Sequence, residues 1–317
     1  MSCQTNGPGL TNCGASSESC CTSLEVPGGT YDRTYTNAGG GPVGAADPAS
    51  VSAFRLDKYL VTVGRFRQFA SAWGGVDGGA GYFPAAGSGK HTHLNGGKGL
   101  VNVGSDAGVE YETGWVASDD GNLAPTNANL SCMPPYSTWT NSAGSQESLP
   151  INCVNWYEAY AFCIWDGGFL PSEAEWAYVA DGGNQQREYP WGSADPGTGS
   201  LYAINGCDYP NGSGTCTGVT NIAPVGVATL GAGLWGQLDL VGEVLVWTMD
   251  WYATYVDPCT DCAYLSSTGT RVVRSADYSN LFPAAALHPW GRGGSAPGSV
   301  PSAARSVITG FRCARTL

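Results

Sequence analysis

Residues 149–183 read LPINCVNWYEAYAFCIWDGGFLPSEAEWAYVADGG and contain two helix-start signals. Asn155 is followed three residues later by Glu158, and Ser172 is followed in the same way by Glu175. This is the spacing of a capping box, in which two side chains satisfy the free amide groups at the start of a helix. An apolar run follows each pair, so the stretch predicts two consecutive helices.

The segments around this stretch predict strands and one further helix. Residues 24–29, LEVPGG, and 54–62, FRLDKYLVT, have the alternation and the turn residues expected of short strands. Thr62 is a suitable N-cap for a helix that ends at Gly74. Its apolar residues share one helical face: Phe66, Phe69, Ala70 and Trp73. Beyond residue 183 short apolar runs alternate with turns, so we expect a loop-rich α+β domain.

Composition limits the classes of function. The chain has 317 residues, 42% of them hydrophobic, with a formal charge of -12. Such a negative chain repels phosphate backbones and anionic lipid, which argues against nucleic acid as a partner. The sequence has no apolar run long enough for a transmembrane helix. The first twenty residues lack the pattern of a signal peptide, so we expect a mature or trimmed form.

The twelve cysteines predict a disulfide framework, because many of them lie in loops rich in Gly, Ser and Asn. Disulfides imply an oxidising location, either extracellular, at the cell surface or periplasmic. We expect a cysteine-rich tail over residues 1–22 and one domain over residues 23–317. Cys3 could carry a lipid anchor or form a disulfide.

Three cysteine pairs are predicted from their local sequence. Cys207 and Cys216 bracket a turn sequence and would staple a hairpin. Cys259 and Cys262 have the spacing of redox motifs and of half zinc sites, but no second such pair completes a zinc set, so a local disulfide is favoured. We also pair Cys132 with Cys153.

The three histidines offer few catalytic or metal-binding arrangements. His91 and His93 would share one face of an extended segment and could bind one metal ion. No Cys or carboxylate lies near them in sequence, so a solvated glycine-rich loop is the favoured interpretation. His288 is the third, and the G-x-S-x-G pattern of serine hydrolases is absent.

A calcium site is a hypothesis for residues 239–243. Asp239, Gly242 and Glu243 could supply side-chain and backbone oxygens at alternating positions. The aromatic residues that follow are expected in the core, with a ligand groove as the alternative. They are Trp247, Trp251, Tyr252 and Tyr255.

Taken together, these segments resemble the formylglycine-generating enzymes, or sulfatase-modifying factors. The resemblance runs through LEVPGGTY, FRLDKYLVTVGRFRQFASAW and residues 149–183, then REYPWG, APVG, GLWGQLDLVGEVLVWTMDWY, RVVR and GFRCAR. It covers residues 23–317. It implies a disulfide-stapled, loop-rich variant of the C-type-lectin-like fold, with a structural disulfide between Cys163 and Cys313.

The resemblance also indicates where the enzyme chemistry would reside. The family binds copper(I) through two cysteine thiolates after the RV motif and oxidises a substrate cysteine to formylglycine. Aligned on Arg271–Arg274, those positions hold Asn280 and Ala285 here. An amide and a methyl group cannot replace soft sulfur ligands, so we expect no copper and no oxidase activity. The family's Gly-Gly after the motif is Ser275-Ala276.

The family's calcium sites are only partly matched. Asp239 and the carbonyl groups of Gly242 and Val244 match ligands of one site, and Glu243 could replace a carboxylate that the family keeps further along. The other site has Ala203 and Thr217 where oxygen-bearing side chains belong. We expect that second site to be empty or replaced by the Cys207–Cys216 staple.

The final segment, residues 275–310, is rich in Ala, Gly, Pro and Ser, so we expect surface loops. In lectin-like folds this region faces the ligand, and proteins diversified by retroelements carry their variable residues there. Aromatic anchors among adaptable polar groups are typical of recognition surfaces. The candidate ligand-binding residues are Asp277, Tyr278, Asn280, Phe282, His288, Trp290 and Arg292.

Three functions stay open. The favoured one is a non-catalytic extracellular or surface protein that binds an unknown protein or glycan. The second is an active oxidase or another metalloenzyme that uses different ligands. The third is a structural subunit of an extracellular assembly. The sequence leaves the oligomeric state undetermined.

Overall fold

The computed structural model describes residues 12–74, 81–212, 214–279, 287–292 and 298–317. Its main helices are α1 (Val63–Trp73), α2 (Asn127–Leu130), α3 (Trp156–Trp165) and α4 (Glu173–Ala180). Short 3-10 turns are η1 (Asn95–Gly97), η2 (Ala117–Asn122), η3 (Gly183–Gln185), η4 (Val219–Asn221) and η5 (Thr229–Gly231). Among the described residues, no helix combines the length and the apolar content needed to cross a bilayer.

The strands form small sheets. They are β1 (Ser23–Val26), β2 (Gly29–Thr36), β3 (Val43–Val51), β4 (Phe54–Asp57), β5 (Val101–Asn102), β6 (Glu110–Tyr111), β7 (Leu245–Trp251), β8 (Cys259–Thr260), β9 (Cys262–Ala263), β10 (Arg271–Arg274), β11 (Ser299–Val300), β12 (Thr309–Gly310) and β13 (Ala314–Arg315). The sheet orders are β1-β4-β13, β11-β10-β7-β12, β2-β3-β8 and β6-β5-β9. β7 runs antiparallel to β10 and parallel to β12. This mixture of short strands and few helices confirms the predicted α+β class.

The predicted helix starts are confirmed. Thr62 caps α1 by accepting a hydrogen bond from the Arg65 amide. α3 and α4 each begin with a complete capping box, Asn155 with Glu158 and Ser172 with Glu175. Both helices are buried on most of their surface, so each lies inside the fold rather than on it.

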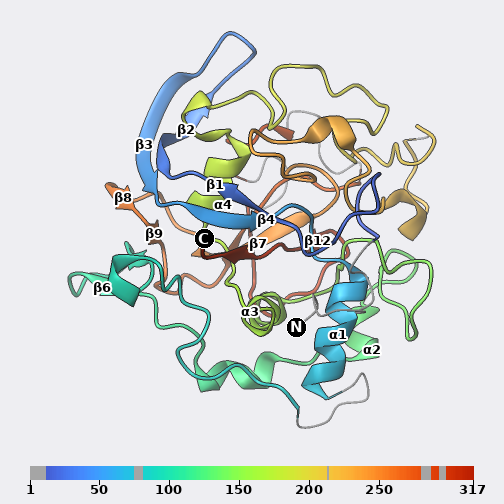
Figure 1. Ribbon diagram of the computed structural model, residues 1–317, viewed down its shortest axis with the longest axis horizontal. Coiled ribbons are helices and arrows are strands. Elements are labelled where there is room, and N and C mark those ends of the chain that lie inside the picture. The colour runs from blue at the N-terminus through green and yellow to red at the C-terminus, as the bar shows by residue number, and fades with distance from the viewer. Residues whose placement is uncertain (1–11, 75–80, 213, 280–286, 293–297) are drawn as a thin grey trace.

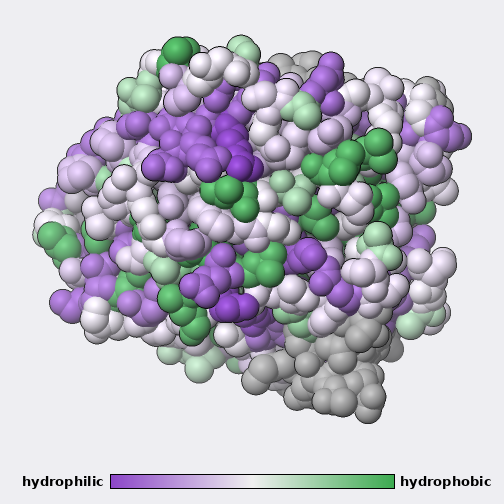
Figure 2. All heavy atoms as spheres, turned by 45° about the horizontal axis from the view of Figure 1, so that its top comes forward, coloured by the Kyte–Doolittle hydropathy of each residue, from purple (hydrophilic) through white to green (hydrophobic). Residues whose placement is uncertain are grey.

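Two large apolar clusters form most of the core. One surrounds α4 and includes β1, β3 and β4, and the other lies between α1, α3 and β7. Figure 1 shows β4, β7 and β12 across the middle of the molecule, with α4 and the β2–β3 hairpin on one side and α1 and α3 on the other. The outer face in Figure 2 carries small apolar patches separated by polar residues.

The predicted disulfides Cys132–Cys153, Cys163–Cys313, Cys207–Cys216 and Cys259–Cys262 all form. Cys13 pairs with Cys20. The Cys163–Cys313 bond ties α3 to the final residues of the chain.

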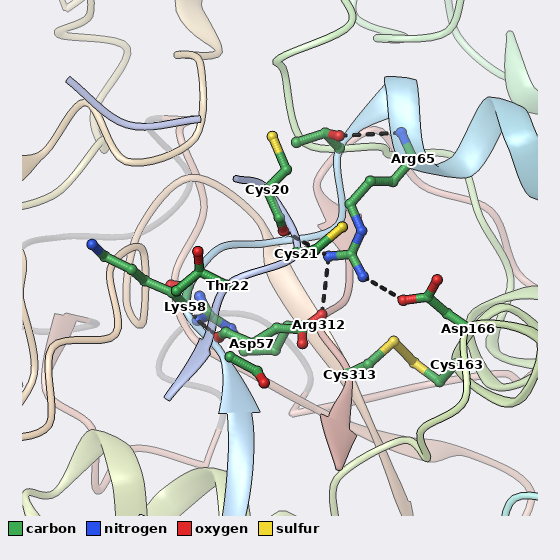
Figure 3. A network of polar contacts seen from close by, with 12 residues as sticks. Cys20, Cys21, Thr22, Asp57, Lys58, Arg65, Cys163, Asp166, Arg312 and Cys313 are labelled. Atoms are coloured by element: carbon green, nitrogen blue, oxygen red, sulfur yellow. Dashed lines mark hydrogen bonds and ion pairs between the residues drawn. A yellow bond between two sulfur atoms is a disulfide. The ribbon is translucent and has the colours of Figure 1, made fainter. Parts of the chain in front are cut away.

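A buried ionic network lies beside the Cys163–Cys313 disulfide (Figure 3). Arg65, at 0% exposure, donates to the Asp57 carboxylate at 3.0 Å, to the Cys20 carbonyl oxygen at 3.1 Å and to the Asp166 carboxylate at 2.7 Å. Arg315 donates to both carboxylates as well. The network therefore joins residues 12–22 to β4, α1, α3 and β13.

Candidate functional site

The segment after β10 is held to the N-terminus of α4 by ion pairs. Glu173 is the first residue of α4 and is buried, and Arg292 donates to its two carboxylate oxygens through Nε and Nη2, both at 2.7 Å. Arg274 donates to the same carboxylate at 3.2 Å and to the Pro289 carbonyl oxygen at 2.6 Å. Burial alone would raise the pKa of Glu173, but the two arginines outweigh it and hold that pKa below its usual value.

The predicted ligand-binding residues do not all lie at the surface. Asp277 and Tyr278 are 0% and 1% exposed, so the expectation that they lie on surface loops is wrong. Tyr278 packs in an apolar cluster with Ile204 and Ile222, and its amide donates to the Glu243 carbonyl oxygen. Apolar packing and a backbone hydrogen bond outweigh the loop-like composition of this stretch.

Three predicted positions lie outside the described residues: Asn280, Phe282 and Ala285. Cys3, the possible lipid-bearing residue, also lies outside them. His288, Trp290 and Arg292 are described, and each is partly exposed. Ligand contact by Asn280, Phe282, His288, Trp290 and Arg292 stays a prediction, as do the lost copper position at Ala285 and the lipid anchor or disulfide at Cys3.

His288 and Trp290 belong to a continuous aromatic ladder, which we define as Tyr35, Trp290, His288, Tyr189, Trp191 and Tyr202. Successive ring centroids lie 5.0, 4.3, 5.0, 4.9 and 5.3 Å apart in that order. Tyr35 is buried beneath Trp290, and the other members are half-buried. Burial lowers the pKa of His288, so its imidazole is neutral at pH 7 and can stack as an uncharged ring.

The sequence reasoning missed Tyr189, Trp191 and Tyr202 as members of this surface. Tyr189 and Trp191 stand in REYPWG, which matched the family pattern but carried no sign of its proximity to residues almost a hundred positions later. Their rings are stacked with an interplanar angle of 4°. Stacked, half-buried aromatic rings offer a large rigid contact surface with little conformational entropy to lose on binding.

Copper(I) has no pair of thiolates available in the described part of the chain. Every cysteine there is disulfide-bonded. Copper(I) is held by soft thiolate ligands in this chemistry, and a disulfide sulfur carries no such charge. The cysteines of the described ranges therefore do not fit the metal, and the two aligned positions, Asn280 and Ala285, lie outside those ranges.

The hypothetical calcium residues fit a hard cation better. Asp239 and Glu243 are 6% and 1% exposed, and burial raises the pKa of both, that of Asp239 to about 6. The charge of Asp239 raises the pKa of Glu243 further, and Glu243 Oε2 has no hydrogen-bond partner. Asp239, Gly242 and Glu243 all have positive φ angles, which curl the backbone here.

A calcium ion at this place would have two carboxylates and backbone oxygens as ligands. No group of three His, Cys, Asp or Glu side chains suited to a metal occurs within the described ranges. The set would therefore depend on the carbonyl groups of Gly242 and Val244. Ala203 and Thr217 stand at positions of the family's second calcium site. Ala203 is buried, whereas Thr217 is exposed and its hydroxyl donates to the Asn221 side chain.

His91 corrects a prediction. It is 0% exposed rather than solvated, with Nδ1 2.9 Å from Glu112 and Nε2 3.1 Å from Glu175. Burial alone would lower its pKa, but the two carboxylates raise it to about 10, so the ring is a buried cation. Both ring nitrogens are occupied, which makes His91 a structural ion pair rather than a metal ligand. His93 packs on Phe169 nearby.

The aromatic residues that follow the proposed calcium ligands fall into buried and partly exposed positions. Trp247 is 1% exposed and belongs to the core, as expected. Trp251 is partly exposed and lines a cavity, and Tyr252 is 39% exposed. Tyr255 donates to Glu173 at 3.2 Å.

Comparisons with curated proteins place these features in a family. The chain is 29% identical to the formylglycine-generating enzyme of Thermomonospora curvata over 92% of each chain. It is 34% identical to that enzyme of Mus musculus over 37% of this chain and 33% of the mouse protein. It is 30% identical to the mouse inactive C-alpha-formylglycine-generating enzyme 2 over 57% of this chain and 55% of that protein. The mouse alignments thus span about half or less of those proteins.

Solved structures agree on the fold. PvdO from Pseudomonas aeruginosa superposes with a TM-score of 0.54 at 17% identity, covering 93% of this chain and 94% of that one. Treponema denticola variable protein 1 gives 0.50 at 17% identity, with 93% and 95% coverage. Residues 12–317 match the family described as the sulfatase-modifying factor enzyme 1-like domain. The chain therefore belongs to the sulfatase-modifying factor, or formylglycine-generating enzyme, family.

Proposed function

We propose that this chain is a non-catalytic binding protein built on the formylglycine-generating-enzyme scaffold. The aromatic ladder carries the proposal. Its exposed edges lie beside the segment that Arg292 and Arg274 tie to α4, so a ligand would meet stacked rings on a fixed support. The ligand is a protein or a glycan, because both present flat apolar faces that can stack on aromatic rings.

The loss of catalysis has separate support. The alignment on the RV motif puts Asn280 and Ala285 at the copper positions, and the described cysteines are all in disulfides. One relative in the family is itself named inactive. Because the disulfides are compatible with an oxidising compartment, the proposed location is extracellular, at the cell surface or periplasmic.

We further propose that calcium holds the backbone at residues 239–244. Burial raises the pKa of both carboxylates, and the charge of Asp239 raises that of Glu243 further, so one cation would stabilise both as anions. Calcium would supply structure there and no chemistry.

An oxidase assay tests the central proposal. The purified protein is loaded with copper(I) and incubated with a cysteine peptide of the sulfatase type, and mass spectrometry detects any aldehyde product. We expect no aldehyde above a metal-free control. Aldehyde formation with multiple turnovers would overturn the proposal and favour the oxidase, which the 92% coverage by the Thermomonospora curvata enzyme keeps as the second candidate.

A binding screen tests the role of the ladder. Wild-type protein, Trp290→Ala and Trp191→Ala are applied to glycan and protein arrays. We expect each substitution to weaken any specific signal by at least about tenfold, the typical effect of removing an aromatic anchor. Phe83→Ala is the matched control, because Phe83 is 38% exposed and takes part in none of the ring contacts that link the ladder residues. Equal signals for all four proteins would remove the ladder from the proposal.

A further inference from the structure

A second concave site lies away from the aromatic ladder, between α3, β6 and the ends of β7 and β10. It is a cavity of about 460 Å³ whose apolar wall includes Trp156, Tyr157, Tyr160 and Trp251. Its size falls within the range of small-molecule sites, which typically combine an aromatic wall with a few polar groups. The charged groups of this wall determine what it can bind.

Arg271, the first residue of β10, lies at the bottom of this wall between two indole rings. Its guanidinium carbon is 3.6 Å from the Trp156 ring centroid and 3.8 Å from that of Trp251. The side chain is 8% exposed, and Nη1 donates to the Met249 carbonyl oxygen. Nε is buried without a partner, and Nη2 makes no hydrogen bond to any described residue. Both faces of the guanidinium are covered while one edge lacks an acceptor.

Other buried arginines have more acceptors than Arg271, although the Nε atoms of Arg274 and Arg312 also lack a partner. Arg65 pairs with two carboxylates and Arg274 pairs with Glu173. Arg312 donates to four backbone carbonyl oxygens. Arg271 has one backbone acceptor and no carboxylate within ion-pair distance among the described residues. Burial lowers its pKa to about 9, which shows how poorly its charge is solvated.

A ligand that displaces solvent from the cavity could supply an acceptor for that edge. A guanidinium edge offers parallel N–H groups, the geometry that matches the two oxygens of a carboxylate. In a site screened from water such a charge-assisted pair is stronger than at an open surface.

Asp119 supplies the opposite charge at the same cavity. It is partly exposed, and its carboxylate has no ion pair or hydrogen bond within the described residues. Burial raises the pKa of Asp119, and the attraction of Arg271 acts against that rise. Glu112 also lines the cavity, but its carboxylate is occupied by His91. Glu110 lines the cavity too, but it is exposed and has no resolved interaction with Arg271, whereas Asp119 interacts with Arg271. A ligand ammonium group would therefore be placed at Asp119.

We propose that this cavity binds a free amino acid with an aromatic side chain, its carboxylate on the edge of Arg271, its ammonium group at Asp119 and its ring against Tyr157 and Tyr160. The proposal is independent of the proposed function, because it uses none of the ladder residues and requires no oxidation.

Isothermal titration calorimetry with three related compounds tests the assignment. L-Phenylalanine carries both charges, 3-phenylpropionate lacks the ammonium group and 2-phenylethylamine lacks the carboxylate. We expect L-phenylalanine to bind one to one and each of the others to bind at least about tenfold more weakly, since each loses one charged contact. Equal binding of phenylpropionate and phenylalanine would overturn the zwitterion assignment.

Variants locate the site. Asp119→Asn and Arg271→Lys should each weaken L-phenylalanine at least about tenfold, the first by removing a charge and the second by removing the fork geometry. Asp119→Asn disturbs no hydrogen bond of the described fold, so it keeps the test valid if Arg271→Lys unfolds. Phe83→Ala is the control. No saturable binding would show that Arg271 serves only to pack the two indoles. Binding unchanged in Asp119→Asn would overturn the placement of the ammonium group.

Discussion

Arg292 binds Glu173 through two parallel hydrogen bonds of 2.7 Å, across 119 positions of sequence. The carboxylate is almost completely buried and receives Arg274 and Tyr255 as well. Because a buried charge is stable only when it is paired, this carboxylate is the point at which the C-terminal segment is fixed to α4.

Glu173→Gln should lower the free energy of unfolding by about 3–5 kcal/mol, because it leaves two arginines without their carboxylate. Chemical denaturation at pH 7 measures the change. The pKa of Glu173 is held below its ordinary value, so this stabilisation is present above about pH 4.5 and disappears as the pH falls further. Asp257→Asn is the control, since Asp257 is 42% exposed beside Arg33 and should change stability by under about 1 kcal/mol. A small effect of Glu173→Gln would mean that the segment is held elsewhere.

The ion pairs of His91 also make the folding stability depend on pH, but here stability is lost at alkaline rather than acid pH. Its pKa is raised to about 10 from 6.5, so its ion pairs with Glu112 and Glu175 are fully present below about pH 6.5 and are lost as the pH rises through 10. A shift of that size corresponds to roughly 5 kcal/mol. We expect wild-type protein to lose more stability than His91→Gln between pH 6.5 and 10 in urea denaturation. Parallel curves would show that the ring is neutral in the folded state.

When calcium is added back to protein that has first been stripped with EDTA, the melting temperature should rise. At a hundredfold excess of the ion over its Kd, binding to the folded state stabilises it by about 2.7 kcal/mol. Differential scanning fluorimetry measures the shift, which should vanish in Asp239→Asn and Glu243→Gln. Glu25→Gln, at an exposed position of β1, should retain it. A calcium response that survives both substitutions would place the ion at another site.

Two disulfides that close loops of very different length should differ in their effect on stability. Cys163–Cys313 closes a loop with a sequence separation of 150, whereas Cys259–Cys262 has a separation of 3. Loop-closure entropy predicts a loss of about 5 kcal/mol when the first pair is replaced by serines and under about 2 kcal/mol for the second. Guanidinium denaturation of the two double variants compares them. Similar losses would show that native contacts rather than chain entropy dominate.

Local signals were sufficient for much of the fold. The capping boxes at Asn155 and Ser172 predicted α3 and α4 because each depends on residues three positions apart. The staple between Cys207 and Cys216 was readable for the same reason. Cys163–Cys313 came only from the family resemblance, since nothing local joins residues so far apart.

The features that the sequence did not reveal all depend on distant partners. His91 is buried because Glu112 and Glu175 reach it from 21 and 84 positions away, which no loop composition indicates. The cavity at Arg271 is assembled from several separate segments. For such sites the sequence contains the residue types, but only the folded chain brings them together.

The C-terminal segment is fixed a second time, since Arg305 donates to both carboxylate oxygens of Glu158 at 2.5 and 2.6 Å. Each arginine therefore docks on the first turn of a different buried helix, with residues 293–304 between the two docking points. Between the two clamps, β11 pairs with β10, and the Ser302 carbonyl oxygen accepts a hydrogen bond from the Trp156 amide. Because these contacts use the backbone, exchanges of exposed side chains over residues 298–304 would leave the supporting frame in place.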